Sequence, residues 1–127
     1  MTCFWDGILN TLTNEDFEKF KFKKMPNSEF VLFLKKFNKK TENVNWNNEK
    51  FSDRQLDENF THIKDFDYQS IRNGYDCSTC DPFLILICEL FCVSIVHNYI
   101  GNKLYYNHSN PKRVLNFGSN SGHFYNS

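Results

Sequence analysis

The hydrophobic pattern is strongest in the last third of the chain, where it predicts a buried helix followed by strands. Residues 83–91 are almost all apolar, and Asp81-Pro82 before them supplies a good N-cap and a proline suited to the first helical position. The pattern then changes to β-branched residues over 93–99, which favours a buried strand. Gly101-Asn102 is typical of a two-residue hairpin turn, and it leads into a second strand at 104–106.

The C-terminal pattern predicts two further strands separated by a polar loop. Residues 114–117 (Val-Leu-Asn-Phe) favour a strand, residues 118–122 (Gly-Ser-Asn-Ser-Gly) favour a flexible loop, and His123 begins the last strand. We therefore expect an α+β fold in which helices pack on a small, mostly antiparallel sheet. The final edge of that sheet presents a histidine.

The first half of the chain predicts four helices. Residues 3–12 place their apolar side chains on one helical face, and residues 14–24 favour a short helix that runs into a loop. Ser28 is the expected N-cap of a third helix, which has lysines at its C-terminal end. Residues 52–55 (Ser-Asp-Arg-Gln) match a capping box that begins a fourth helix.

Two predicted loops carry candidate chemistry. The polar loop 41–50 holds one large apolar side chain, Trp46, which is expected either to pack on the core or to wall a substrate channel. The loop 65–80 contains Cys77-x-x-Cys80, the spacing of half a zinc site or of a redox pair. A closed zinc site needs four ligands, and the sequence has no second Cys-x-x-Cys or His-x-x-x-His. Both alternatives stay open.

Composition limits the class of protein. The chain has 127 residues, which we assign to a single domain (1–127) large enough to bury a core without disulfides or metals. Fifteen basic residues balance fifteen acidic ones, so nucleic-acid binding is not expected. The apolar run 82–96 contains Glu89 and is too short to span a bilayer. With five cysteines and no predicted signal peptide, we expect a monomeric cytoplasmic protein with reduced thiols that binds no membrane.

Among the four histidines, His123 has the surroundings of a working base. The loop before it gives access, and the strand after it would fix the ring. His97 alternates with apolar neighbours and is expected in the core, whereas His62 is expected at the surface and His108 in a polar loop. Cys3 falls in the first turn of the first predicted helix, where the helix dipole favours thiolate; the alternative is an unreactive residue near a loose terminus.

Both ends of the chain carry a resemblance to a known family. Cys3-Phe4-Trp5 begins the first helix, Glu89-Leu90 lies in the helix before the central strand, and Gly122-His123-Phe124 begins the last strand. In this order and spacing the residues resemble the ovarian-tumour (OTU) family of papain-like cysteine proteases, in a compact viral branch. The resemblance hardly covers residues 13–70. It implies a papain-like OTU fold, with the nucleophile on the first helix and the histidine on the last strand.

What the resemblance implies is a deubiquitinase. Cys3 would be the nucleophile and His123 the general base and acid, and the reaction would pass through a thioester. The family's substrates are ubiquitin or related modifiers and their conjugates, cut after the C-terminal Gly-Gly. Only glycines pass the narrow channel, whose walls we assign to Trp46 and Tyr75. No metal or cofactor is implied, and such a viral protein would be found in the host cytoplasm or in the virion.

The third member of the catalytic site is less clear in the family pattern. Members often place Asn or Asp two positions after the histidine, where this chain has Tyr125. Asn126, one position further, is therefore the candidate, although a regular strand turns it to the opposite face from Tyr125. Asn116 and Asn120 are possible substitutes. A Cys–His dyad is the simpler assignment.

The segment before the predicted nucleophile departs from the family pattern. The family usually has Asp-Gly-Asn there, and its backbone helps form the oxyanion hole. Met1 and Thr2 precede Cys3 in this chain, so one donor is either missing or supplied by another loop. An alternative hypothesis is therefore a protein that keeps the fold without the chemistry, as a ubiquitin-binding or host-interaction module. A third is a structural or zinc-linked protein that uses Cys77 and Cys80.

Overall fold

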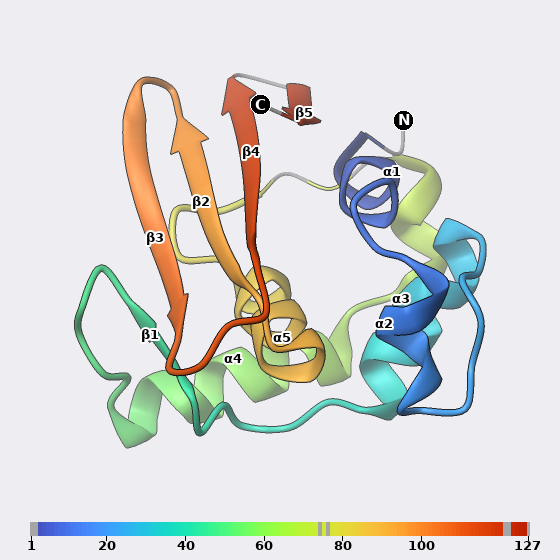
Figure 1. The fold of residues 1–127 in the computed structure, drawn as a ribbon, viewed down its shortest axis with the longest axis horizontal. Helices are drawn as coiled ribbons and strands as arrows, with labels where there is room; N and C mark the ends of the chain where they lie inside the picture. The colour runs from blue at the N-terminus through green and yellow to red at the C-terminus, as the bar shows by residue number, and fades with distance from the viewer. Residues whose placement is uncertain (1–2, 74, 76, 121–122, 127) are drawn as a thin grey trace.

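The computed structural model describes residues 3–73, 75, 77–120 and 123–126. In chain order its elements are α1 (Cys3–Leu9), α2 (Asn14–Glu18), α3 (Asn27–Lys36), β1 (Val44–Trp46), α4 (Asp53–Asp65), the 3-10 helix η1 (Tyr68–Asn73), α5 (Pro82–Phe91), β2 (Ser94–Tyr99), β3 (Asn102–His108), β4 (Val114–Asn120) and β5 (His123–Asn126). The strands form one sheet, and α5 packs against β1, β2 and β3 on one of its faces (Figure 1). The other face carries exposed side chains, among them Tyr105 and Val114.

The sheet is mixed, with the strand order β1-β3-β2-β4-β5. Three pairings are antiparallel, and β4 runs parallel to β2. The pair is parallel because the connection from β3 returns to the N-terminal end of β2, so that β4 begins beside the residue where β2 begins. The Lys112 amide donates to the Cys92 carbonyl (2.7 Å), and the Ser94 amide donates to the Arg113 carbonyl (3.1 Å). The predicted α+β class with a small, mostly antiparallel sheet is confirmed.

The predicted hairpin between β2 and β3 is present, but its turn lies one residue earlier than Gly101-Asn102. Tyr99 pairs with Asn102, which leaves Ile100 and Gly101 as the two turn residues. Both have positive φ, 49° and 82°, as a type I′ turn requires. Glycine suits this conformation, whereas the β-branched Ile100 is strained in it, and its side chain is 59% exposed. In the sequence, Gly101 could be either the first or the second residue of the turn. The pairing of Tyr99 with Asn102 makes it the second.

Five other predicted boundaries are wrong. The first helix ends at Leu9 rather than at residue 12, and the predicted loop 65–80 contains η1. The third helix has Pro26 rather than Ser28 at its N-cap. The predicted loop 41–50 contains β1, because residues 44–46 of this asparagine-rich segment pair with the end of β3. The predicted loop 118–122 is shorter, since β4 continues to Asn120 and pairs with β5.

The N-terminal caps predicted for α4 and α5 are confirmed. The Ser52 hydroxyl accepts a hydrogen bond from the Gln55 amide (3.2 Å), and the Gln55 side chain accepts one from the Ser52 amide (2.8 Å). Asp81 Oδ1 accepts a hydrogen bond from the Phe83 amide (2.9 Å), with Pro82 at the start of the helix. Local signals therefore place both helix starts.

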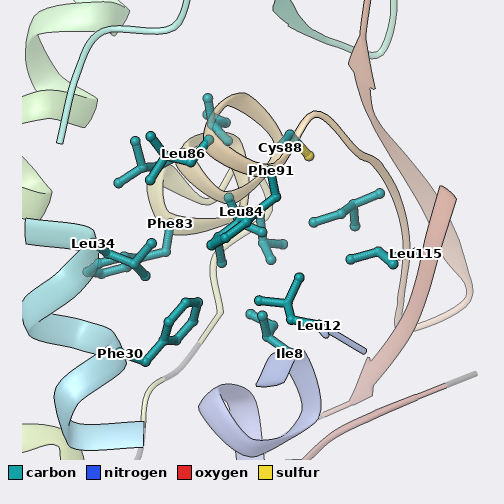
Figure 2. Packing of buried hydrophobic residues seen from close by; sticks show 14 of the residues in the cluster. Ile8, Leu12, Phe30, Leu34, Phe83, Leu84, Leu86, Cys88, Phe91 and Leu115 are labelled. Carbon is teal, nitrogen blue, oxygen red and sulfur yellow. The ribbon is translucent and has the colours of Figure 1, made fainter. Parts of the chain in front are cut away.

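Helix α5 forms the centre of the hydrophobic core. Every one of its residues after Pro82 is buried, Glu89 included. Figure 2 shows Phe30 of α3, Ile8 of α1 and Leu115 of β4 pointing into the same interior. Although α5 is strongly apolar, no helix in the described ranges has the length and apolar character needed to cross a membrane.

Candidate functional site

The first helix and the last strand lie side by side (Figure 1), and two phenylalanines form the contact. The ring centroids of Phe4 on α1 and Phe124 on β5 are 5.0 Å apart, and both side chains are buried. Each phenylalanine directly follows one of the predicted catalytic residues, Cys3 and His123. The fold therefore brings these two backbone positions into one neighbourhood, which we call the α1–β5 junction.

The side chains of the three predicted catalytic residues, Cys3, His123 and Asn126, lie outside the described part of the structure. Their backbones are placed by α1 and β5. In the β4–β5 ladder, His123 pairs with Asn120 and Asn126 pairs with Phe117. β5 is the last strand in the sheet order, so the junction lies at a sheet edge.

The two residues predicted to wall a channel lie in different parts of the fold. The Tyr75 ring is 4.6 Å from that of Phe4 and 5.5 Å from that of Trp5, between centroids, so Tyr75 lies at the junction. Trp46 lies on β1, at the opposite edge of the sheet from β5. It is half-buried against the hydrophobic core, as one of the two predictions for it states. The sheet order separates Trp46 from the junction.

A fully buried carboxylate, Asp81, fixes the segment that carries Tyr75. Its Oδ2 accepts hydrogen bonds from the Tyr75 hydroxyl (2.8 Å) and the Ser78 amide (2.9 Å). Its backbone N–H donates to the Tyr106 hydroxyl (2.9 Å). Burial raises the pKa of Asp81, although the hydrogen bonds that it accepts oppose this shift. Burial and the neighbouring Asp81 also raise the pKa of Tyr75, which therefore stays a hydrogen-bond donor.

A thiol–imidazole pair that the sequence analysis missed lies beneath the junction. The His97 ring centroid is 5.7 Å from that of Phe124, and its Nε2 is 2.7 Å from the Ser119 Oγ. Its Nδ1 is 4.0 Å from the Cys77 sulfur. His97 is buried and has a polar partner, which confirms its prediction as a core residue. We call Cys77 and His97 the neutral cluster, because both are uncharged near pH 7.

The lengths of α5 and β2 could have predicted that Cys77 and His97 lie close together. α5 has ten residues and β2 has six, so they span about 15 Å and about 20 Å. A strand that folds back along the helix before it brings its far half beside the residues that precede that helix. Cys77 precedes α5 and His97 lies in the far half of β2.

Both members of this pair are uncharged near pH 7. Burial lowers the pKa of His97 to about 4. Burial, together with the nearby Asp81, raises the pKa of Cys77 well above its usual range. A cysteine nucleophile needs the thiolate form, which an adjacent imidazolium stabilises. Cys77 and His97 therefore form a structural pair rather than a nucleophile and its base.

The Cys77-x-x-Cys80 pair consists of free thiols. The Cys77 sulfur is 4.0 Å from the His97 Nδ1 and 3.6 Å from the Ser78 carbonyl oxygen. Within the described ranges, no three His, Cys, Asp or Glu side chains are grouped closely enough to hold a metal ion.

No protein-family model, curated protein or solved structure matches this chain. The candidate site is therefore defined by the geometry of the α1–β5 junction and by the resemblance in the sequence. Its described surroundings are aromatic, with Phe4, Tyr75 and Phe124 in mutual or shared contact.

Proposed function

We propose that this protein is a cysteine-dependent hydrolase with a papain-like fold of the OTU type, and that its active site is the α1–β5 junction. The contact between Phe4 and Phe124 carries the proposal, since each follows a predicted catalytic residue by one position. Adjacent Cα atoms are about 3.8 Å apart, so this contact keeps the backbones of Cys3 and His123 within reach of a shared substrate.

In the proposed reaction, the His123 imidazole takes the proton of the Cys3 thiol, and the thiolate attacks the carbonyl carbon of the scissile bond. The tetrahedral intermediate collapses to a thioester as His123 gives the proton to the leaving amine. The same imidazole then deprotonates a water molecule that hydrolyses the thioester and frees the thiol. Because α1 has only seven residues, we ascribe the stabilisation of the thiolate mainly to the imidazole.

The other cysteines are poorer candidates for the nucleophile. Burial raises the pKa of Cys80 to about 11 and that of Cys88 well above its usual range, as it does for Cys77. Cys92 ends α5, and its sulfur is 3.5 Å from the Lys19 ammonium nitrogen rather than beside an imidazole. These surroundings favour Cys3 as the reacting thiol.

The substrate class follows from the resemblance. We propose that the bond cut follows the C-terminal Gly-Gly of ubiquitin or a related modifier. Glycines have no side chain, so such a tail fits a channel narrowed by large rings. Phe4, Tyr75 and Phe124 supply rings at the junction, and Asp81 holds Tyr75 in place.

Covalent capture tests this function. The protein is mixed with ubiquitin that carries a C-terminal propargylamide, an electrophile that reacts with a catalytic cysteine. We expect a ubiquitin-sized band shift for the unchanged protein and none for Cys3→Ala. His123→Gln should react at least about a hundredfold more slowly, because the thiol loses its base. Cys92→Ala is the matched control, since it removes a free thiol on a partly exposed residue, and it should react normally.

The outcomes separate the hypotheses. Labelling that survives Cys3→Ala would remove the assignment of the nucleophile. Binding of ubiquitin without labelling, measured by calorimetry, would favour the alternative of a ubiquitin-binding module without chemistry. Neither labelling nor binding would remove ubiquitin as the substrate class.

A further inference from the structure

A groove on the helical side of the molecule is not part of the α1–β5 junction. It lies between residues 22–26 and the outer face of α3, and its volume is about 480 Å3. Pockets that bind drug-sized ligands measure roughly 300–1,000 Å3. In Figure 1, α3 lies at the right, away from β1 and β3.

The floor of this groove is apolar and partly exposed. The side chains of Phe22 and Leu32 are 38% and 44% exposed, and the neighbouring Phe33 is buried. Leu32 lies three or four residues from Glu29 and Lys36, so these three side chains share the outer face of α3. Large apolar side chains that gather in one hollow indicate an interaction surface, unlike single ones scattered over a protein.

The rim of the groove is basic. Lys23, Lys24 and Lys36 line it and are exposed, and Glu29 is the acidic residue that lines it. Residues 19–40 hold eight lysines and one acidic residue, whereas the rest of the chain holds seven basic and fourteen acidic residues. The zero net charge of the chain therefore conceals a concentrated positive region around this groove.

The rim lysines keep their charge available. Across the described part of the chain, Lys23, Lys24 and Lys36 form no ion pair, whereas Lys39 beyond the groove pairs with the buried Glu89 (3.7 Å). Lys36 instead places its ammonium nitrogen 5.6 Å from the centre of the Phe22 ring, at the mouth of the groove. A negative ligand would meet these charges without displacing a carboxylate from them.

The groove is preformed. The Lys24 amide donates to the Asn14 side chain (2.9 Å), and the Phe22 amide donates to the Phe17 carbonyl (3.2 Å). The Phe22 ring packs edge-on against Phe33, with centroids 5.4 Å apart. These contacts tie the segment 22–26 to α2 and α3, which reduces the ordering cost of binding.

We propose that this groove binds an acidic segment of a partner protein that inserts a large apolar side chain between Phe22 and Leu32. The hollow shape favours an inserted side chain, whereas a membrane anchor projects apolar residues from its surface. Stacking of a nucleic-acid base is disfavoured because Lys36 and Phe33 already occupy positions around the Phe22 ring. Acidic groups on either side of the anchor would complement the lysine rim. The proposal does not depend on the hydrolase activity.

Fluorescence polarisation of a labelled peptide tests the proposal. The probe is a fluorescein-labelled peptide of about twelve residues, with one leucine and one phenylalanine a helical turn apart among Glu and Asp. We expect saturable binding that Leu32→Asp and Lys36→Glu each weaken at least about tenfold. Lys103→Glu is the matched control, because it makes the same charge change at an exposed position of β3 and should leave binding unchanged. Circular dichroism checks that each variant is folded.

Three results would overturn the proposal. The first is equal binding of a peptide in which serine replaces both the leucine and the phenylalanine, because attraction would then be charge alone. The second is binding of single-stranded RNA or of phosphatidylserine vesicles that depends on Leu32 as the peptide does. The third is a molecular mass that doubles with concentration and returns to that of one chain in Leu32→Asp, which would make a second copy the occupant. Labelling by the ubiquitin probe should be the same in Leu32→Asp and the unchanged protein, so failure here and failure of the proposed function are distinguishable.

Discussion

Asp16 and Glu89 are buried carboxylates that stay charged, whereas Cys77 and His97, the neutral cluster beneath the junction, are uncharged near pH 7. The Arg113 guanidinium holds both oxygens of Asp16, at 2.9 and 2.7 Å. Glu89 Oε1 accepts hydrogen bonds from the Thr41 hydroxyl (2.6 Å) and the Asn43 amide (3.0 Å). Burial opposes ionisation, but the hydrogen bonds outweigh it, so the pKa of Asp16 falls well below its usual range and that of Glu89 falls to about 2.

In the neutral cluster, the effect of burial on the pKa values is larger than that of the hydrogen bonds. His97 has one close polar neighbour, the Ser119 hydroxyl, and among the described residues no carboxylate lies within hydrogen-bond distance of its ring. Its pKa is therefore lowered to about 4 by burial, and the pKa of Cys77 is raised by burial and by Asp81. The charged carboxylates accept hydrogen bonds from several donors, and for Asp16 one donor is a guanidinium, whereas His97 and Cys77 have few polar neighbours.

The comparison indicates that the charged carboxylates and the neutral cluster have different structural roles. The charged carboxylates connect segments that are distant in the chain: Asp16 binds α2 to Arg113 before β4, and Glu89 binds α5 to the residues before β1. The neutral cluster instead provides a floor of uncharged side chains beneath Phe124, whose ring centroid is 5.7 Å from that of His97. A floor of low polarity strengthens the interaction between charges placed above it. Such a floor suits a thiolate–imidazolium pair at the junction.

The largest expected effect comes from breaking a charged tether. Arg113→Met leaves Asp16 buried without its main partner, so the free energy of unfolding should fall by about 3–5 kcal/mol in urea denaturation. Arg54→Met is the matched control, because its pair with Glu58 is exposed and should contribute less than about 1 kcal/mol. Equal effects of the two substitutions would show that Asp16 does not depend on Arg113.

His97 should make the protein sensitive to mild acid. Its pKa in the folded protein is about 4, below the 6.5 of a free imidazole, so the unfolded chain binds the proton more tightly. Stability should be complete above pH 6.5 and should be lost as the pH falls from 6.5 towards 4, by up to about 3 kcal/mol. Urea denaturation over this range measures the slope. His97→Gln should flatten it, and an unchanged slope in that variant would contradict the assignment.

Glu89 should matter in a lower pH range. Its pKa in the folded protein is about 2, below the usual 4.5, so its contribution is present above pH 4.5 and is lost as the pH falls towards 2. Glu89→Gln should cost about 2 kcal/mol at pH 7, since it removes the charge that four donors share. The cost should shrink below pH 4.5.

Glu42→Gln is the matched control for Glu89→Gln. Glu42 is exposed and contributes its backbone amide, not its carboxylate, to the Glu89 site. It should therefore change stability by less than about 0.5 kcal/mol at any pH in this range. If the two variants behave alike, the hydrogen bonds to Glu89 do not anchor the segment before β1.

The unit from Asp81 to Tyr99 could be predicted because its signals agree with one another. A cap, a run of buried residues and a change to β-branched residues occur in succession, and each predicts the same boundary. β1 could not be predicted in this way. It has three residues in an asparagine-rich segment, so although Val44 and Trp46 favour strands, pairing with β3 and the Glu89 hydrogen bonds place it.

At the candidate site, the sequence predicts the elements better than the packing. β5 begins at His123 as expected, but Gly118 lies in β4 rather than in a loop. The reason is non-local: a Cβ atom at Gly118 would come within 2.5 Å of the Tyr125 ring, so glycine here permits close packing between strands. The contact of His97 with Cys77 also depends on how β2 folds back along α5, which the lengths of the two elements indicate but no residue propensity does.

The smallest expected effect comes from relieving backbone strain at Ile100, and it tests whether that strain is independent of the titration of His97. Ile100 has φ 49° in the turn after β2, and its amide donates to the carbonyl of Ser119, the partner of His97 (3.0 Å). Asparagine tolerates this conformation better, so Ile100→Asn should stabilise the fold by about 0.5–1 kcal/mol. Because the substitution changes no charge, the gain should be equal at pH 7 and at pH 5, where His97 is expected to lower stability. A gain that varies between these pH values would mean that the turn and the neutral cluster are coupled through Ser119.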